Sequence, residues 1–180
     1  MNPQLIVHIP QSLFATAEAA EFSGTYEPGS IDMGPDTYSA VQPMSWTTTI
    51  TNVGGAFLVR GSVAGSVSTA CARCLDDFTI PVNGEIEGYF IIEGQGEAPE
   101  DMDDDEFDIL PPTNEIDMEP LLLAAVLLEL PLIPLCDEEC KGICQTCGKN
   151  LNEGPCDCAS EEADVSPAHP FAALKDLKFD

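Results

Sequence analysis

The sequence predicts an α+β fold: an antiparallel β meander or partly open barrel packed by one buried helix, with a small cysteine-rich, zinc-binding C-terminal segment. Three observations support this prediction. Apolar and polar residues alternate from 57 to 92, a largely apolar run occupies 121–135, and five of the eight cysteines lie between 140 and 158. With 180 residues, 44% of them hydrophobic, the chain is long enough for one ordinary domain and a small appendage.

Residues 1–135 form the predicted β-rich body. Leu5–Ile9 is an apolar run typical of a first strand, and Gln11–Phe22 has the Ala and Glu content of a short helix or loop. Strand signals accumulate from 37 to 92, where Thr, Val and aromatic residues are frequent and 52–55 has turn composition. We expect about four or five strands in this stretch.

The alternation is clearest on either side of the Cys71–Cys74 pair. One face carries, in order along the chain, Phe57, Val59, Val63, Val67 and Cys71, and after the pair Ile80, Val82, Ile86, Phe90 and Ile92. A period of two predicts antiparallel strands with one face in the core, and it places the cysteine pair at a strand end. Gly61 and Gly65 suggest a bend or bulge in the first of these strands.

Two further segments complete the body. An acidic loop is predicted over 94–110, because the eight acids within 97–108 repel one another and favour solvation; a decoy for a basic surface is the alternative interpretation. A helix is predicted over 117–130, capped by Asp117 and ended by Pro131. Its residues are apolar nearly all the way round, so we expect it to be buried against the sheet.

The rest of the chain divides into two parts. Residues 136–158 form the cysteine-rich, metal-binding segment, and residues 159–180 form an acidic linker and a short C-terminal helix. The helix is predicted because Phe171, Leu174 and Leu177 recur at helical spacing.

All eight cysteines are candidate metal ligands, and they occur in closely spaced pairs: Cys71 and Cys74, Cys136 and Cys140, Cys144 and Cys147, and Cys156 and Cys158. Zinc prefers four tetrahedral ligands, and such pairs let one turn present two thiolates to one ion, so one or two zinc ions are expected. The Cys144–Cys147 knuckle can pair with Cys156 and Cys158 across a loop of eight intervening residues, which leaves the other two pairs for a second site, although Cys140 lies close enough to the knuckle to compete. An exchange of partners between the sites stays open, as do an iron–sulfur cluster and free thiols.

No catalytic motif stands out in the sequence. The two histidines, His8 and His169, do not lie near a Ser or Cys in a recognisable nucleophile motif, and a Gly-rich phosphate loop is lacking. We therefore expect no enzymatic activity and no small-molecule substrate. The alternative from another functional class is a cytosolic thiol redox or metal-carrier protein that uses the same cysteines.

Charge limits the expected partners. Asp and Glu number 32 against 6 Lys and Arg, a formal net charge of −26. Such a surface repels phosphate backbones and anionic headgroups, while a basic protein is attracted. Local RNA contact through Lys141, Lys149, Lys175 and Lys178 stays the alternative. With no secretory signal and no apolar run of membrane-spanning length, we expect a cytoplasmic protein without membrane contact.

Several signatures occur in one order: ACARCLDDF after a β meander, an acidic loop, EIDMEPLLLAAVLLELPLIPLC, CKGICQTCGKNLNEGPCDC and a terminal HPFAALKDLK. From about Val59 onward, this chain resembles the bacterial and plastid large ribosomal RNA subunit accumulation proteins, the YceD-like family. The resemblance covers Cys71, Arg73 and Cys74, the stretches 116–134 and 136–158, and the tail residues Pro170, Phe171, Leu174, Leu177 and Lys178. It implies a non-enzymatic ribosome biogenesis factor that supports accumulation or processing of large-subunit ribosomal RNA. The charge then favours binding of a basic large-subunit ribosomal protein or pre-ribosomal particle over extensive RNA contact.

Overall fold

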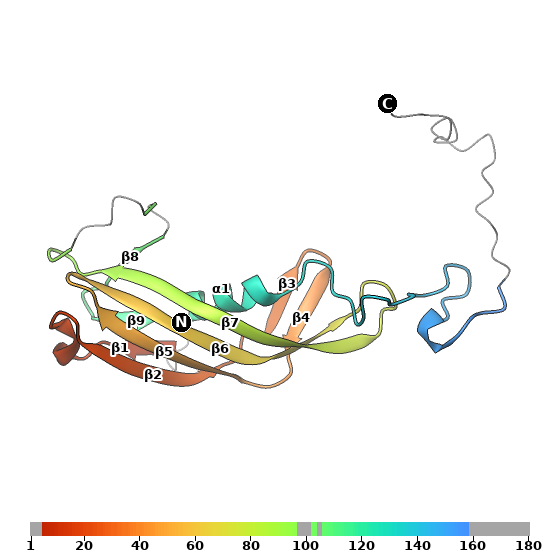
Figure 1. Ribbon diagram of the computed structural model, residues 1–180, viewed down its shortest axis with the longest axis horizontal. Coiled ribbons are helices and arrows are strands. Elements are labelled where there is room, and N and C mark those ends of the chain that lie inside the picture. Colours follow the sequence, from red (N-terminus) through yellow and green to blue (C-terminus); the bar gives the residue numbers. More distant parts are fainter. Residues whose placement is uncertain (1–4, 97–101, 104–105, 159–180) are drawn as a thin grey trace, which may run out of the picture.

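Two long strands form the centre of the fold. In the computed structural model, which describes residues 5–96, 102–103 and 106–158, β6 (Ala56–Ala70) and β7 (Asp77–Ile91) pair antiparallel along their whole length (Figure 1). Their predicted apolar faces lie in the core: Phe57, Val59 and Val63 are buried completely. The period-two prediction is therefore confirmed for both strands.

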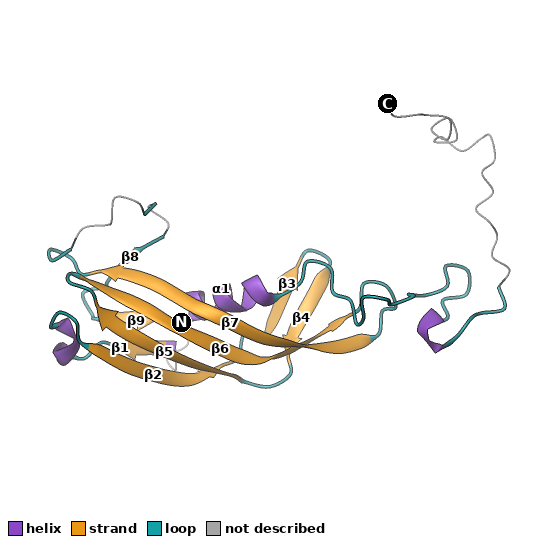
Figure 2. Cartoon of the chain, in the orientation of Figure 1, coloured by secondary structure: helices purple, strands orange, loops and turns teal. Residues whose placement is uncertain are grey.

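The other strands of this seven-stranded sheet lie on both sides of the central pair (Figure 2). Along one edge of β6, β5 pairs with residues 57–64 and β4 with residues 67–68; β2 then pairs with β5, and β3 with β4. The short β8 pairs with β7 in parallel, whereas the other pairings in the sheet are antiparallel. The bounds are β2 (Ala19–Tyr26), β3 (Ser30–Met33), β4 (Asp36–Ala40), β5 (Met44–Asn52) and β8 (Asp108–Ile109). The predicted antiparallel sheet is confirmed, and it does not close into a barrel.

A second layer packs on the sheet and closes the core. It consists of the two-stranded ladder of β1 (Ile6–His8) and β9 (Glu115–Asp117) and of the helix α1 (Glu119–Glu129). The described residues also contain two short 3₁₀ helices, Gln11–Phe14 and Leu151–Glu153. Leu5, Val7, Ile116, Met118 and Leu122 join the apolar side chains of the sheet in one core cluster.

The helix matches its prediction closely at both ends. Asp117 Oδ1 accepts a hydrogen bond from the backbone N–H of Glu119 (3.0 Å), and Pro131 follows the extended C-cap residue Leu130. The expected burial is correct for only one face. Leu122, Ala125 and Val126 are buried, whereas the side chain of Leu128 is 85% exposed. The sheet covers only one side of α1, so an apolar face remains in solvent.

Two sequence predictions need correction. Part of Gln11–Phe22 is a strand, because Ala19 to Phe22 pair with β5 from Thr51 to Thr48. The expected four or five strands in 37–92 are found as four, β4 to β7, and the sheet gains β2 and β3 from residues 19–33, where no strands were predicted. The predicted bulge in β6 is wrong as well, because the register with β7 continues without interruption through Gly61 and Gly65.

These glycines permit close packing in place of a bulge. A Cβ at Gly61 would lie only 2.7 Å from the Cα of Thr48, and one at Gly65 would lie 2.9 Å from the Cβ of Met44. Gly84 on β7 has the same role beneath α1, where an added Cβ would collide with the backbone of Ala125. Small residues at these positions let β5 and the helix approach the central strands.

Some predicted segments lie outside the described residues: parts of the acidic loop (97–101 and 104–105) and the whole linker and C-terminal helix (159–180), with His169. His8 is described, and its Nδ1 lies 3.2 Å from Glu115 Oε1 in the β1–β9 ladder. Among the helices that the structure describes, none has the length and apolar character needed to cross a membrane.

Candidate metal centre

The eight cysteine sulfurs come together in two groups of four. We name Cys71, Cys74, Cys136 and Cys140 the proximal group, and Cys144, Cys147, Cys156 and Cys158 the distal group. Within each group the sulfurs lie within 4.8 Å of one another, and none of the eight cysteines is in a disulfide. This is the first of the groupings that the sequence predicts, and partners are not exchanged between the groups.

The proximal group joins two distant parts of the chain. Cys71 and Cys74 lie in the turn between β6 and β7, while Cys136 and Cys140 lie after residues 130–135, which follow the C-terminal end of α1. Cys71, Cys74 and Cys140 are buried and form a small cluster with Phe78 and Leu135 beside it. The proximal group therefore joins the segment that follows α1 to the turn that connects β6 and β7 (Figure 1).

The sulfur separations in the proximal group fit a tetrahedral ion. The Cys71 and Cys140 sulfurs are 3.8 Å apart, and those of Cys74 and Cys136 are 3.6 Å apart. Zinc–sulfur bonds of ~2.3 Å in a tetrahedron place the sulfurs about 3.8 Å from one another. The four thiols thus already have the spacing that zinc coordination needs.

Both C-x2-C turns use the same backbone geometry. The N–H of Leu75 donates to the carbonyl of Cys71 (2.9 Å), as the N–H of Gly148 donates to the carbonyl of Cys144 (2.8 Å). The residue after each second cysteine is left-handed, with φ of 64° at Leu75 and 73° at Gly148. Glycine adopts this conformation without strain, while leucine rarely does. Cysteine spacing predicts both turns, but only the second carries a glycine at the left-handed position.

Backbone N–H groups point at the proximal sulfurs. Burial raises the pKa of the Cys71 thiol, but N–H donors from Cys136 and Arg73, each 3.4 Å away, help to outweigh it and lower the pKa to about 6. Cys136 is exposed as a residue, but desolvation of its sulfur among the other three thiols, together with the hydrogen bond to Cys140, raises its pKa to about 12. The surroundings therefore favour the thiolate at Cys71 and the thiol at Cys136, and a cation bound by all four sulfurs would replace the remaining protons.

Two residues outside the cysteine set hold the proximal group together. The Arg73 guanidinium donates to the carbonyls of Glu138 and Cys140, both at 3.0 Å. The Asn152 side-chain amide donates to Cys140 Sγ at 3.2 Å and lowers the pKa of that thiol, while its Oδ1 accepts from the N–H of Lys141 at 2.8 Å. Family resemblance had marked Arg73, but no sequence signal marked Asn152.

Asn152 also connects the two groups, because it belongs to the loop between Cys147 and Cys156 that closes the distal group. The distal group is less covered: Cys147 is exposed and its other members are half-buried. N–H groups of Cys147 and Thr146 lower the pKa of Cys144 to about 6. The donor set is again four thiols, so the residues of both groups fit zinc, which would act there as a structural ion that crosslinks the segment.

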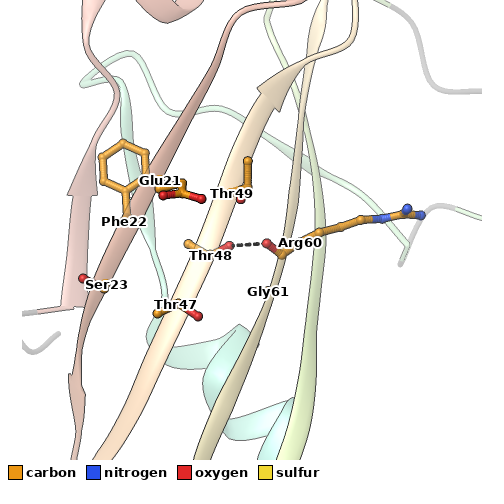
Figure 3. A pocket seen from close by; sticks show the side chains of 8 residues that line it. All are labelled: Glu21, Phe22, Ser23, Thr47, Thr48, Thr49, Arg60 and Gly61. Carbon is orange, nitrogen blue, oxygen red and sulfur yellow. Dashed lines mark hydrogen bonds between the residues drawn. The ribbon is translucent and has the colours of Figure 1, made fainter.

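A depression on the outer surface of the sheet has a different character. It has a volume of about 480 Å³ and lies over β2, β5 and β6 (Figure 3). Its lining consists of Glu21, Phe22, Ser23, Thr47, Thr48, Thr49, Arg60 and Gly61. The Thr48 hydroxyl donates to the Arg60 carbonyl at 2.9 Å, and the Arg60 side chain points away from the other labelled side chains (Figure 3). This lining offers hydroxyls without a histidine or cysteine to activate them.

Comparison with known proteins identifies the family. The family model described as "Large ribosomal RNA subunit accumulation protein YceD" matches residues 59–178, about two thirds of the chain. The chain belongs to the YceD family. The matched region begins within β6 and includes β7, α1 and both cysteine groups, so it contains the whole candidate metal centre of this YceD protein.

Curated relatives of this YceD protein come from plants and mycobacteria. It is 41% identical over 61 residues to the Arabidopsis thaliana "Large ribosomal RNA subunit accumulation protein YCED homolog 1, chloroplastic", covering 34% of this chain and 19% of that protein. An uncharacterized Mycobacterium tuberculosis protein is 32% identical over 108 residues, covering 59% of this chain and 50% of that protein. A Mycobacterium leprae protein is 28% identical over 128 residues, with 71% and 52% covered. The chain thus spans about half or less of the length of these relatives, and no solved structure matches it.

Proposed function

We propose that this protein is a non-enzymatic ribosome biogenesis factor that supports accumulation of large-subunit ribosomal RNA by binding a basic large-subunit ribosomal protein or pre-ribosomal particle. Membership of the YceD family, whose name refers to that accumulation, is the observation that carries the proposal. The net charge of −26 directs the mechanism towards protein partners, because a strongly acidic surface attracts basic chains and repels phosphates.

The contacts of the Lys and Arg side chains that the structure describes give a second reason to expect little RNA contact. Arg60 pairs with Glu87 at 3.8 Å, Arg73 donates to two carbonyls of the proximal segment, and Lys149 Nζ donates to the carbonyl of Pro155 at 2.9 Å. Three of the four cations among the described residues thus have partners within the chain. Affinity for nucleic acid depends on cations that neutralise phosphates, and these three are engaged elsewhere.

Affinity purification of the tagged full-length protein, with and without ribonuclease, tests the proposal. We expect basic large-subunit proteins to remain bound after complete RNA digestion. An unrelated tagged protein of similar net charge is the control for non-specific ionic capture. Loss of all ribosomal proteins after digestion would instead mean that the association depends on RNA, and the protein-binding mechanism would be wrong.

We further infer that both cysteine groups hold zinc, as resident structural ions. The four-thiol sets, the sulfur spacing and the N–H donors support zinc over free thiols. Elemental analysis of protein purified without added metal tests this inference. About two zinc ions per chain that resist mild chelation are expected; iron, or no metal at all, contradicts it.

The competing function is thiol redox or metal-carrier activity by the same cysteines. The distal group is the better candidate for it, because Cys144 has a pKa lowered to about 6 and the group is partly exposed. Cys71 has a similarly low pKa but is buried. Slow alkylation of all thiols in native protein argues for resident zinc, whereas rapid alkylation of Cys144 with metal release favours the carrier function.

A further inference from the structure

The outward face of α1 is apolar where a surface helix is normally polar. Its residues Pro120, Ala124 and Leu128 succeed one another at four-residue spacing, and all three are exposed. The chain continues beyond the helix with Leu132, which is 83% exposed, and Ile133, which is 68% exposed. We name Leu128, Leu132 and Ile133 the apolar ridge.

The ridge is held in place by its neighbours. On one side of Leu132, the carbonyl of Pro131 accepts a hydrogen bond from the Tyr38 hydroxyl of β4. On the other side, Pro134 is buried and its carbonyl accepts from the N–H of Ala72 at 2.8 Å. The segment that carries Leu132 and Ile133 is therefore fixed at both ends, with its large side chains directed into solvent. Preorganised apolar groups lose little conformational freedom when a partner covers them.

The charges around the ridge select the partner. Glu129 and the run Asp137–Glu139 are exposed and flank the ridge in sequence, and residues 119–140 contain five acids and no lysine or arginine. The guanidinium of Arg73 donates to the Glu138 carbonyl, so one positive charge lies against this acidic stretch, which stays negative overall. An anionic rim disfavours a phosphate backbone and an anionic lipid surface, because both carry the same sign of charge. The same rim attracts a cationic polypeptide.

We propose that the apolar ridge and its acidic rim form the docking surface for a basic polypeptide segment that presents large apolar side chains on one face. The apolar side chains of that segment pack on Leu128, Leu132 and Ile133, and its lysine or arginine side chains face Glu129 and Asp137–Glu139. The inference rests on the proposed function, since it specifies which surface of this protein binds the basic ribosomal partner.

Binding to RNA-free proteins extracted from purified large ribosomal subunits tests the inference. The tagged full-length protein is compared with Leu128→Gln/Leu132→Gln, with the rim variant Glu129→Gln/Glu138→Gln, and with Val41→Gln as a control, because Val41 is 55% exposed outside the ridge. We expect retention of basic proteins to fall at least about tenfold in the ridge variant, more modestly and in a salt-dependent way in the rim variant, and not at all in Val41→Gln. Unchanged thermal melting shows that each variant is folded.

Each other outcome overturns a different statement. Equal retention by wild type and ridge variant refutes the ridge inference and leaves the proposed function standing. No retention of any ribosomal protein by wild type refutes both. Two further outcomes assign the ridge to another occupant. A dimer in sedimentation that Leu128→Gln dissociates would mean that a second copy of the chain covers the ridge. A tenfold gain of retention in Leu174→Gln/Leu177→Gln would mean that the C-terminal tail covers it.

Discussion

Asn152 provides the sharpest test of the metal centre, because one side chain donates to a cysteine sulfur and accepts from the backbone. Replacement by Ala removes both the 3.2 Å bond to Cys140 Sγ and the 2.8 Å bond from Lys141 N–H. A hydrogen bond to a charged acceptor contributes about 1.5–3 kcal/mol, and loss of such support around a metal site typically weakens binding about 10–100-fold. Asn152 is exposed, so we expect the lower end, about tenfold weaker zinc binding by the proximal group.

Asn152→Asp separates the two bonds. The aspartate keeps an oxygen for the N–H of Lys141, but it places a carboxylate where the amide donated to the sulfur. Two negative groups at this distance repel each other. If the sulfur contact matters, zinc affinity decreases in the order Asn, Ala, Asp. If only the backbone contact matters, Asp equals Asn and Ala is weakest.

Competition between the protein and a chromophoric zinc chelator measures these affinities. We expect weaker binding of one zinc ion, the one at the proximal group, and unchanged binding of the other. Asn83→Ala serves as the matched control, because Asn83 is an exposed asparagine on β7, away from the cysteines. Equal affinities in wild type, Asn152→Ala and Asn152→Asp would refute the reasoning, since the amide would then contribute nothing to the proximal group.

Three further outcomes are expected. Leu122→Ala should lower the free energy of unfolding by about 2–5 kcal/mol, whereas Leu128→Ala should change it by less than about 0.5 kcal/mol, because only Leu122 is buried. Urea denaturation measures both values, and equal effects would contradict the assigned helix faces. Gly84→Val should cost about 1–3 kcal/mol by forcing α1 away from β7, whereas Asn83→Val next to it should not. Metal removal by a strong chelator under reducing conditions should lower Tm. It should also let a protease cut within residues 136–158 before it cuts the sheet. An unchanged digestion pattern would mean that metal does not hold this segment.

The sequence predicted β6 and β7 well because each strand keeps one face in the core for most of its length. β2 gave no such signal: its only fully buried residue is Tyr26, and its Ala and Glu content suggested a helix or loop. Pairing with β5 decides its conformation, and this contact is remote in sequence. Gly61 and Gly65 of β6 indicate an irregular position in the strand, but composition alone does not distinguish a bulge from a close approach of two strands.

Spacing predicts the four cysteine pairs, since two thiols close in sequence can reach one ion from a single turn, but it does not decide which pairs share an ion, because Cys140 lies closer to Cys144 than Cys156 does to Cys147. Spacing does not predict the supporting residues either. The contacts of Asn152 and of the Arg73 guanidinium depend on how the β6–β7 turn meets the segment 136–158, a tertiary arrangement without a local signature. The apolar composition of α1 was read as complete burial, but the sheet covers only one face of the helix.

The metal centre and the apolar ridge are mechanically connected through the backbone between them. Ala72 lies between the ligands Cys71 and Cys74, and its N–H holds the carbonyl of Pro134, directly after Ile133 of the ridge. Metal bound at the proximal group would therefore fix one end of the ridge, while the Tyr38 hydroxyl holds the other. On this geometry, a structural ion at the proximal group would serve the proposed function, because it would help to keep the apolar surface preformed for a partner.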